Sequence, residues 1–127
     1  VRGVSFYNDS KATNVDATKR ALEGMEGGIV LIAGGKDKGG SYRAIREEAG
    51  KLKALIAIGE AKDRIALELG DAIPTRIECD MTNAVHRAFA EAGEGDKVLL
   101  SPMCSSFDMF RDYKDRGNTF RRIVEAL

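Results

Sequence analysis

The stretch Ile29-Val30-Leu31-Ile32-Ala33 (IVLIA, residues 29–33) decides the class of fold that this chain can adopt. Its residues are all apolar, most are β-branched, and no polar side chain alternates with them. A strand with this pattern is covered on both of its faces, as the strands of parallel sheets are. We therefore predict a sheet that lies between two layers of helices.

Other short apolar runs lie before and after this one, at residues 4–7, 54–58, 73–77 and 98–100. Between them, apolar side chains recur at helical spacing in residues 18–25, 42–52, 65–69, 81–92 and 120–127. The predicted fold class is α/β because strands that alternate with helices form βαβ units. We expect residues 1–127 to form one Rossmann-like three-layer domain, with a mostly parallel sheet of five to six strands and helices on both faces.

Composition and charge give no sign of a nucleic-acid or membrane partner. The 20 basic and 20 acidic residues balance, so charge gives no reason to expect nucleic acid or an anionic membrane as partner. No apolar run approaches the roughly 20 residues that a membrane span needs. Cys79 and Cys104 lack a CxxC spacing, which favours reduced thiols in a cytoplasmic protein, and no clustered ligands predict a metal site.

Polar residues gather after three of the predicted strands, in residues 8–14, 34–41 and 101–108. In a parallel sheet these three turns leave from the carboxyl edge, where open α/β sheets bind their ligands. We therefore expect the turns to converge and to bring Lys11, Lys38 and Ser106 within reach of one small dianion.

The second turn, Gly34 to Ser41, nearly fits the phosphate-loop pattern G-x-x-x-x-G-K-[ST], but Gly40 occupies the lysine position. We reject that assignment. The glycines allow a close approach of the backbone, and Lys36 or Lys38 can extend over whatever is bound. The alternative is a flexible, solvated lysine loop.

The first turn combines an acid, a cation and hydroxyls. Asp9 can accept a hydrogen bond from a hydroxyl group such as that of a ribose, and Lys11 can neutralise a phosphate. Thr13, near the start of the next helix, can donate to a carboxylate that the helix dipole favours. The alternative is that Asn14 or Asp16 caps the helix and the other side chains are solvated.

The third turn contains Ser105 and Ser106, which could cap a short helix. A nucleophilic serine is disfavoured, because the chain has no G-x-S-x-G motif and His86 is its single histidine.

Together these turns resemble the C-terminal domain of the Mur ligases. The resemblance rests on residues 8–14, Gly34-Gly35 with Lys38, residues 100–106 with Asp108 and Phe110, and Arg116-Gly117-Asn118 followed by Phe120. It extends over essentially the whole chain. Lys11 and Thr13 in the first motif resemble those of the D-glutamate-adding member of the family.

The resemblance implies a reaction. ATP, with Mg²⁺, would phosphorylate the carboxylate of UDP-N-acetylmuramoyl-L-alanine, and the amine of D-glutamate would attack the acyl phosphate to form an amide in peptidoglycan precursor synthesis. It also implies two further domains, an N-terminal UDP-binding domain and a central ATPase domain that holds the metal ligands. We expect this chain alone to be inactive and to bind ATP or D-glutamate weakly.

The resemblance also implies roles for individual residues. Lys11 and Lys38 would be catalytic, and Asp9 and Lys11 would face the nucleotide. The residues that would bind D-glutamate are Thr13, Lys38, Ser106, Phe107 and Tyr113. Two departures from the family pattern are Lys36-Asp37, where Asp-Gly is expected, and Phe107, where Leu is expected.

Two alternatives stay open at this point. The chain could belong to another Mur-type or a folylpolyglutamate-type ligase, or it could be a stand-alone Rossmann-like nucleotide-binding module.

Overall fold

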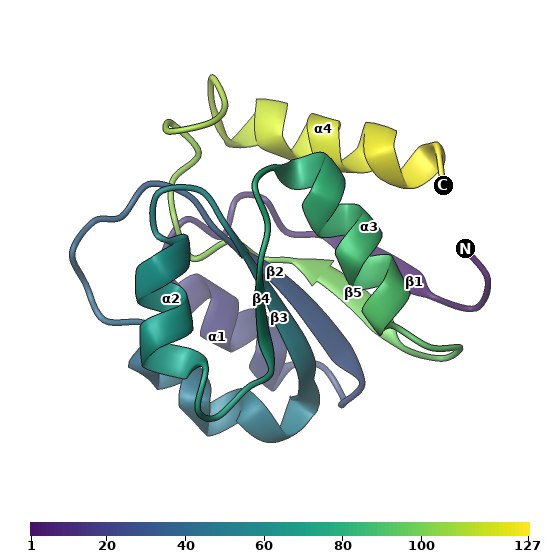
Figure 1. The fold of residues 1–127 in the computed structure, drawn as a ribbon, viewed down its shortest axis with the longest axis horizontal. Coiled ribbons are helices and arrows are strands. Elements are labelled where there is room, and N and C mark those ends of the chain that lie inside the picture. The colour runs from purple at the N-terminus through teal and green to yellow at the C-terminus, as the bar shows by residue number, and fades with distance from the viewer.

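A five-stranded sheet runs through the middle of the computed structural model, which describes all residues 1–127 (Figure 1). Every pair of neighbouring strands is parallel, and their order across the sheet is β1-β5-β2-β3-β4. The prediction of a parallel sheet with five to six strands is confirmed. The strands are β1 (Ser5–Asn8), β2 (Ile29–Gly34), β3 (Leu52–Ile58), β4 (Thr75–Ile77) and β5 (Lys97–Leu100).

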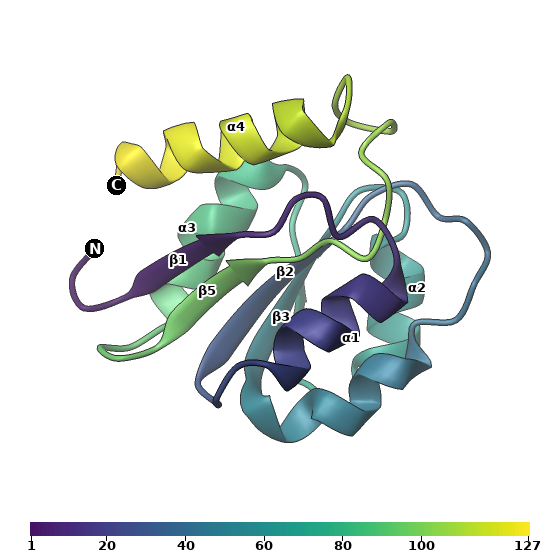
Figure 2. The same ribbon diagram turned by 180° about the vertical axis from the view of Figure 1, so that it is seen from behind.

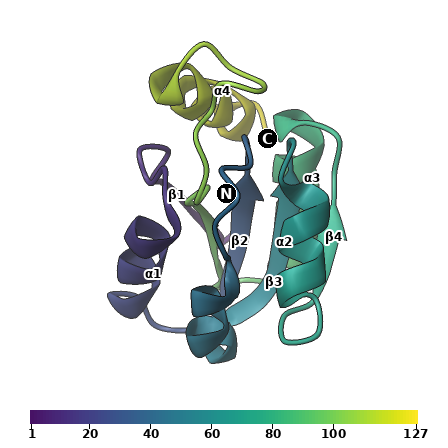
Figure 3. The ribbon, with the colours of Figure 1, turned by 90° about the vertical axis from the view of Figure 1, so that its left-hand side faces the viewer.

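Helices cover both faces of the sheet, so the domain has three layers. Figures 2 and 3 show α1 and α4 on opposite sides of the sheet. Two separate hydrophobic clusters correspond to the two faces: α1, η1 and α2 contribute to one, and α3 and α4 to the other. The helices are α1 (Val15–Glu23), the 3₁₀ helix η1 (Arg43–Lys51), α2 (Lys62–Leu69), α3 (Met81–Glu91) and α4 (Tyr113–Glu125).

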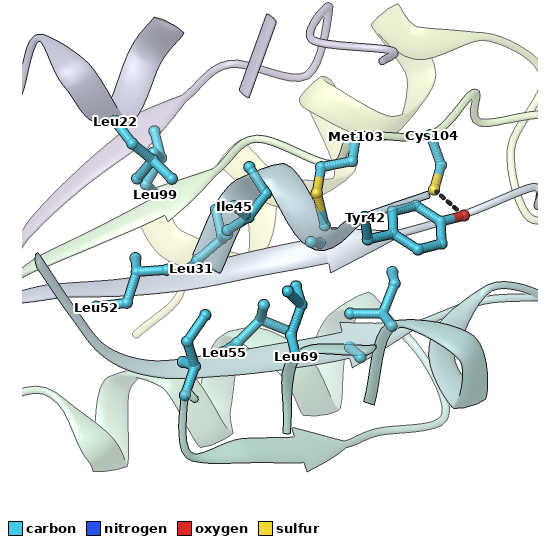
Figure 4. Close-up of a cluster of buried hydrophobic side chains, with 14 of the residues drawn as sticks. Leu22, Leu31, Tyr42, Ile45, Leu52, Leu55, Leu69, Leu99, Met103 and Cys104 are labelled. Atoms are coloured by element: carbon cyan, nitrogen blue, oxygen red, sulfur yellow. Dashed lines mark hydrogen bonds between the residues drawn. The ribbon is translucent and has the colours of Figure 1, made fainter. Parts of the chain in front are cut away.

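The burial of β2 on both of its faces explains why apolar and polar residues do not alternate in its sequence. Leu31 and Ala33 point into the cluster below α1, η1 and α2, part of which Figure 4 draws. Val30 and Ile32 point into the opposite cluster, below α3 and α4. Because β2 lies in the centre of the sheet and is buried on both faces, every one of its positions must be apolar or glycine.

Side-chain caps fix where α1, α3 and α4 begin. Asn14, one of the two caps considered for α1, accepts a hydrogen bond from the backbone of Ala17, and Asp80 accepts one from the backbone of Asn83 at the start of α3. Asp112 caps α4 in the same way. None of the helices is both long enough and apolar enough to cross a membrane.

The helix predicted at residues 42–52 is present but has 3₁₀ geometry over Arg43–Lys51. It passes into β3 at Leu52 with no connecting residue. A 3₁₀ helix rises about 2.0 Å per residue, against about 1.5 Å in an α-helix.

A pair of leucine substitutions tests the core. Leu31→Ala should lower the free energy of unfolding by about 2–5 kcal/mol, because Leu31 is fully buried in β2 and its removal leaves a cavity. Leu67→Ala on α2, where the side chain is 80% exposed, should change it by less than about 0.5 kcal/mol. Urea denaturation of the two variants measures both values, and equal losses would contradict this description of the core.

Candidate functional site

The sheet order brings the three polar turns together at the carboxyl edge. Strand β5 lies between β1 and β2, so the turn that follows β5 lies between the other two. The N–H of Gly34 donates to the carbonyl of Pro102 at 2.9 Å, and that of Lys36 donates to the carbonyl of Ser105 at 3.0 Å. On the other side, the N–H of Met103 donates to the carbonyl of Ala12 at 3.1 Å. The predicted convergence of the three turns is therefore present in the backbone.

Gly34 and Gly35 allow this contact between the turns. Their φ angles are +126° and +143°, in a region that favours glycine. A Cβ on Gly34 would lie 1.9 Å from the carbonyl oxygen of Ile58, and one on Gly35 would lie 2.3 Å from that of Ser105. The two glycines thus admit neighbouring segments of the protein's own backbone.

Arg116, from α4, ties the first turn to the third. Its side chain is only 1% exposed. Nε donates to Ser10 Oγ at 3.0 Å, Nη2 to the Ser10 carbonyl at 2.6 Å, and Nη1 to the Cys104 carbonyl at 2.9 Å. Burial lowers the pKa of Arg116 to about 10, so the guanidinium stays charged at neutral pH. No carboxylate forms an ion pair with it, and backbone and hydroxyl oxygens stabilise the charge instead.

Gly117, next to Arg116, lets α4 approach the first turn closely. A Cβ on Gly117 would lie 3.2 Å from the Cβ of Ser10 and 3.3 Å from the side-chain amide of Asn8. The amide nitrogen of Asn8 donates to the Gly117 carbonyl at 3.0 Å. The triplet Arg116-Gly117-Asn118 therefore joins the last helix to the edge where the turns meet.

One hollow at this edge contains Lys38, and we call it the Lys38 hollow. It has a volume of about 130 Å³. The ammonium of Lys38 donates to the main-chain carbonyl of Thr13 at 3.0 Å, while the Thr13 hydroxyl makes no hydrogen bond within the chain. The structure thus brings these two predicted ligand residues together. The lining residues are Asn14, Val15, Lys36, Lys38, Gly40, Tyr42, Met103 and Cys104.

A second hollow, of about 320 Å³, contains Lys11, and we call it the Lys11 hollow. Its lining includes the predicted ligand residue Tyr113 and carries no carboxylate. Lys11 and Lys38 line different hollows, so the structure does not place them around one common hollow as expected. The lining residues are Asn8, Ser10, Lys11, Tyr113, Lys114, Gly117 and Asn118.

The remaining predicted residues differ in their exposure. Ser106 is 2% exposed, whereas the side chain of Phe107 is 68% exposed and that of Tyr113 is 39% exposed. The Asp9 carboxylate is turned inward, where Oδ2 accepts a hydrogen bond from Ser101 Oγ at 3.0 Å. Ser106 faces neither hollow, so the structure does not bring it together with either lysine.

The serines of the third turn cap no α-helix, which corrects one of the sequence interpretations. The segment from Ser105 to Phe110 forms turns, and the Ser106 carbonyl accepts from the backbone N–H groups of Met109 and Phe110. The first helix after this turn begins at Tyr113, and its cap is Asp112.

Sequence reasoning assigned no role to Tyr42 or Arg64. The hydroxyl of Tyr42 lies 3.1 Å from Asp37 Oδ1 and 3.6 Å from Cys104 Sγ, a contact that Figure 4 marks. Arg64, from α2, donates to Asp37 Oδ1 at 2.5 Å. No local motif could have shown the contacts of Arg64 with Asp37 or of Tyr42 with Cys104, because these partners are 27 and 62 residues apart.

The two cysteines are both free, as the spacing predicts. Cys104 is 1% exposed, and burial raises the pKa of its thiol. A buried thiol with a raised pKa is a packing residue and a poor nucleophile. No group of three or more His, Cys, Asp or Glu side chains is placed so that it could hold a metal ion.

Fold and site together define a Rossmann-like α/β domain with two lysine-lined hollows at the carboxyl edge of its sheet. The sequence model of the family described as "Mur ligase, glutamate ligase domain" matches residues 1–104. The chain belongs to this family.

Curated relatives narrow the comparison. The chain is 49% identical over 128 residues to the UDP-N-acetylmuramoylalanine--D-glutamate ligase of Solibacter usitatus, covering 100% of the chain and 29% of the relative. It is 50% identical over 127 residues to the enzyme of that name from Acidobacterium capsulatum, covering 99% of the chain and 28% of the relative. The enzyme of the same name from Geotalea daltonii is 49% identical over 128 residues, covering 100% of the chain and 28% of the relative. The chain thus spans less than a third of the length of these relatives.

Replacement of Arg116 tests its role in joining the turns. Arg116→Lys keeps the charge but loses the planar fork, so at least one buried oxygen of Ser10 or Cys104 is left without a donor. We expect the free energy of unfolding to fall by about 3 kcal/mol. Arg122→Lys, on the exposed side of α4, is the matched control and should change it by less than about 0.5 kcal/mol. Urea denaturation decides, and equally small changes in both variants would refute the role of Arg116.

Proposed function

We propose that this chain is the C-terminal domain of a cytoplasmic ligase that adds D-glutamate to UDP-N-acetylmuramoyl-L-alanine in peptidoglycan precursor synthesis. The proposal is supported by the curated relatives, which carry the name of that ligase and are about half identical to the chain over nearly all of its length. The activity belongs to the full-length protein. The part that we propose for this chain is to bind the amino acid and to present a cation to the phosphate.

The observation that carries the proposal is the contact of Lys38, which lines the Lys38 hollow, with the main-chain carbonyl of Thr13. The Lys38 ammonium rests on a neutral carbonyl, and the Thr13 hydroxyl is free. A carboxylate of D-glutamate offers Lys38 a stronger, charge-assisted hydrogen bond than that carbonyl does. The hydroxyl of Thr13 can then donate to the same ligand, so that an ammonium and a hydroxyl hold one carboxylate.

The Lys11 hollow fits a phosphate group. Lys11 and Lys114 supply two ammonium groups, Asn8 and Asn118 supply amides, and no carboxylate lines the hollow to repel an anion. ATP would supply the phosphoryl group that activates the acceptor carboxylate. The role of Lys11 would be to neutralise negative charge on that group, and Asp9 would accept a hydrogen bond from a nucleotide hydroxyl through its second oxygen.

The exposed aromatic residues fit a surface that closes on another domain. Phe107 in the third turn and Tyr113 at the start of α4 expose large apolar side chains, and Tyr113 also lines the Lys11 hollow. In the proposed enzyme, the central ATPase domain would cover them when the substrates are bound, and the metal ligands for Mg²⁺ would lie in that domain. Closure of this kind excludes water from an acyl phosphate. Ser106 would reach D-glutamate only if the third turn rearranged on closure, because it is buried here.

Substitution of Lys38 in the full-length ligase tests the proposal. Lys38→Ala should raise the KM for D-glutamate by about tenfold or more, because a charge-assisted contact to the amino acid is lost. The KM for ATP should stay within about twofold, since Lys38 lies outside the Lys11 hollow. Lys53→Ala is the matched control, because Lys53 pairs with Asp96 away from both hollows. Steady-state kinetics measures the KM for D-glutamate and the KM for ATP in both variants, and Lys53→Ala should change neither. A rise in the KM for ATP alone in Lys38→Ala would refute the assignment of Lys38.

A second test uses the isolated 127-residue chain. We expect isothermal titration to give dissociation constants of about 1 mM or weaker for ATP and D-glutamate, because the proposed site is shared with domains outside this chain. Micromolar affinity for either ligand would contradict the proposal that the other domains complete the site.

A further inference from the structure

The segment that carries Lys38 has little support from its own backbone. We call residues 36–41 the lysine loop. From Asp37 to Ser41 no residue makes a backbone–backbone hydrogen bond. A Cβ built on Gly39 or on Gly40 would meet no atom within 4 Å. The position of the Lys38 ammonium must therefore be set by side chains that hold the loop from outside.

Arg64, from α2, holds the lysine loop on both sides of Lys38. Nη1 donates to Asp37 Oδ1 at 2.5 Å, just before Lys38 in the sequence. Nη2 donates to the carbonyl of Gly40, two residues after Lys38. A planar guanidinium can make both contacts at once because its donors diverge at fixed angles.

Arg64 is itself fixed in place. Nη2 also donates to Glu68 Oε2 at 2.8 Å, one turn further along α2. Its guanidinium carbon lies 5.1 Å from the centre of the Tyr42 ring. Glu68 in turn accepts from the backbone N–H of Tyr42 at 2.8 Å and from Ser41 Oγ at 3.1 Å. Two side chains of α2 thus hold the lysine loop: Arg64 binds its middle, and Glu68 binds its end at Ser41.

Asp37 is the point where these contacts meet. Oδ1 accepts from the N–H of Gly39 at 3.0 Å, from the hydroxyl of Tyr42 at 3.1 Å and from Arg64. The hydrogen bond from Gly39, with those from Tyr42 and Arg64, holds the pKa of Asp37 below its usual value, so the carboxylate is ionised at neutral pH. The contacts to Asp37 link the backbone just beyond Lys38 to α2.

We infer that Arg64 is a positioning residue for amino-acid binding: by joining Asp37 to the Gly40 carbonyl, it sets where the Lys38 ammonium stands. The inference rests on the proposed function, which makes Lys38 a ligand of D-glutamate. Arg64 does not line the Lys38 hollow, so it acts through the lysine loop. Without Arg64, the loop loses one contact on each side of Lys38, at Asp37 and at the Gly40 carbonyl. The Lys38 ammonium is then less ordered before binding, and ordering it costs binding free energy.

The test compares Arg64→Ala with Arg46→Ala in the full-length ligase. Arg64→Ala should raise the KM for D-glutamate by about tenfold, leaving kcat and the KM for ATP within about twofold. Arg46 is the matched control, because it makes contacts of the same kind from η1 to Asp71 and the Glu68 carbonyl but none to the lysine loop. Arg46→Ala should therefore leave the KM for D-glutamate unchanged, and an equal rise in both variants would overturn the inference.

Two further variants show whether Arg64 acts through Asp37. Arg64→Lys keeps the charge but not the fork, so its KM for D-glutamate should fall between those of the wild type and Arg64→Ala. Asp37→Asn should also raise this KM, and the double variant with Arg64→Ala should raise it less than the product of the two single effects. Effects that simply multiply would overturn the inference.

Hydrogen exchange supplies a readout that needs no substrate. The amide of Gly39 should exchange faster in Arg64→Ala than in the wild type, and at an unchanged rate in Arg46→Ala. An unchanged rate in Arg64→Ala overturns the inference. Lys38→Ala separates this failure from failure of the proposed function. If Lys38→Ala raises the KM for D-glutamate and Arg64→Ala does not, only the role of Arg64 is wrong. If Lys38→Ala has no effect, both are wrong.

Discussion

The buried guanidinium of Arg116 is the constraint on which the carboxyl edge depends. Removing such a charge from water costs several kcal/mol, and here no carboxylate lies within ion-pair distance of it, although the charge of Asp108 favours the guanidinium from further away. Three hydrogen bonds from a charged donor, each contributing about 1.5–3 kcal/mol, offset a cost of that size. The net gain in stability is therefore small, but the geometry is specific. Any shift of the first turn relative to the third would leave a buried charge or a buried carbonyl without its partner.

Arg116 and Arg64 hold different parts of the three turns in place. Arg116 fixes the first and third turns to each other from inside the domain, at Ser10 and Cys104. Arg64 holds the second turn from the surface, where about a third of its side chain is in contact with solvent. Contacts that are partly solvated break and re-form more readily than buried ones. The edge therefore combines a rigid half around Ser10 with a more adjustable half around Lys38.

Local patterns predicted most of this fold, because they depend on neighbouring residues. The unbroken apolar run of β2 required cover on both faces, and Asn14 and Asp80 were recognisable as caps before helical periodicity. What the sequence did not show depends on distant residues. The sequence allowed Ser105 or Ser106 to cap a short helix, but the residues after Ser106 form a turn whose N–H groups bind the carbonyl of this buried serine. Arg64 had no recognisable partner, because Asp37 comes near it only after β3 has paired with β2. The triplet Arg116-Gly117-Asn118 was visible as a motif, but its contact with Ser10, 106 residues away, was not.

The separation of Lys11 from Lys38 changes how the edge would work under the proposed function. If Lys11 and Lys38 lined one common hollow, the phosphate and the dianionic amino acid would lie side by side, where their charges repel. The two hollows instead give each anion its own ammonium group. Ser10 lines the Lys11 hollow and Cys104 lines the Lys38 hollow, and Arg116 binds both residues. Under the proposed function, the side chain that joins the turns would therefore also fix the spacing between the two proposed anion sites, which the amine would cross to reach the acyl phosphate.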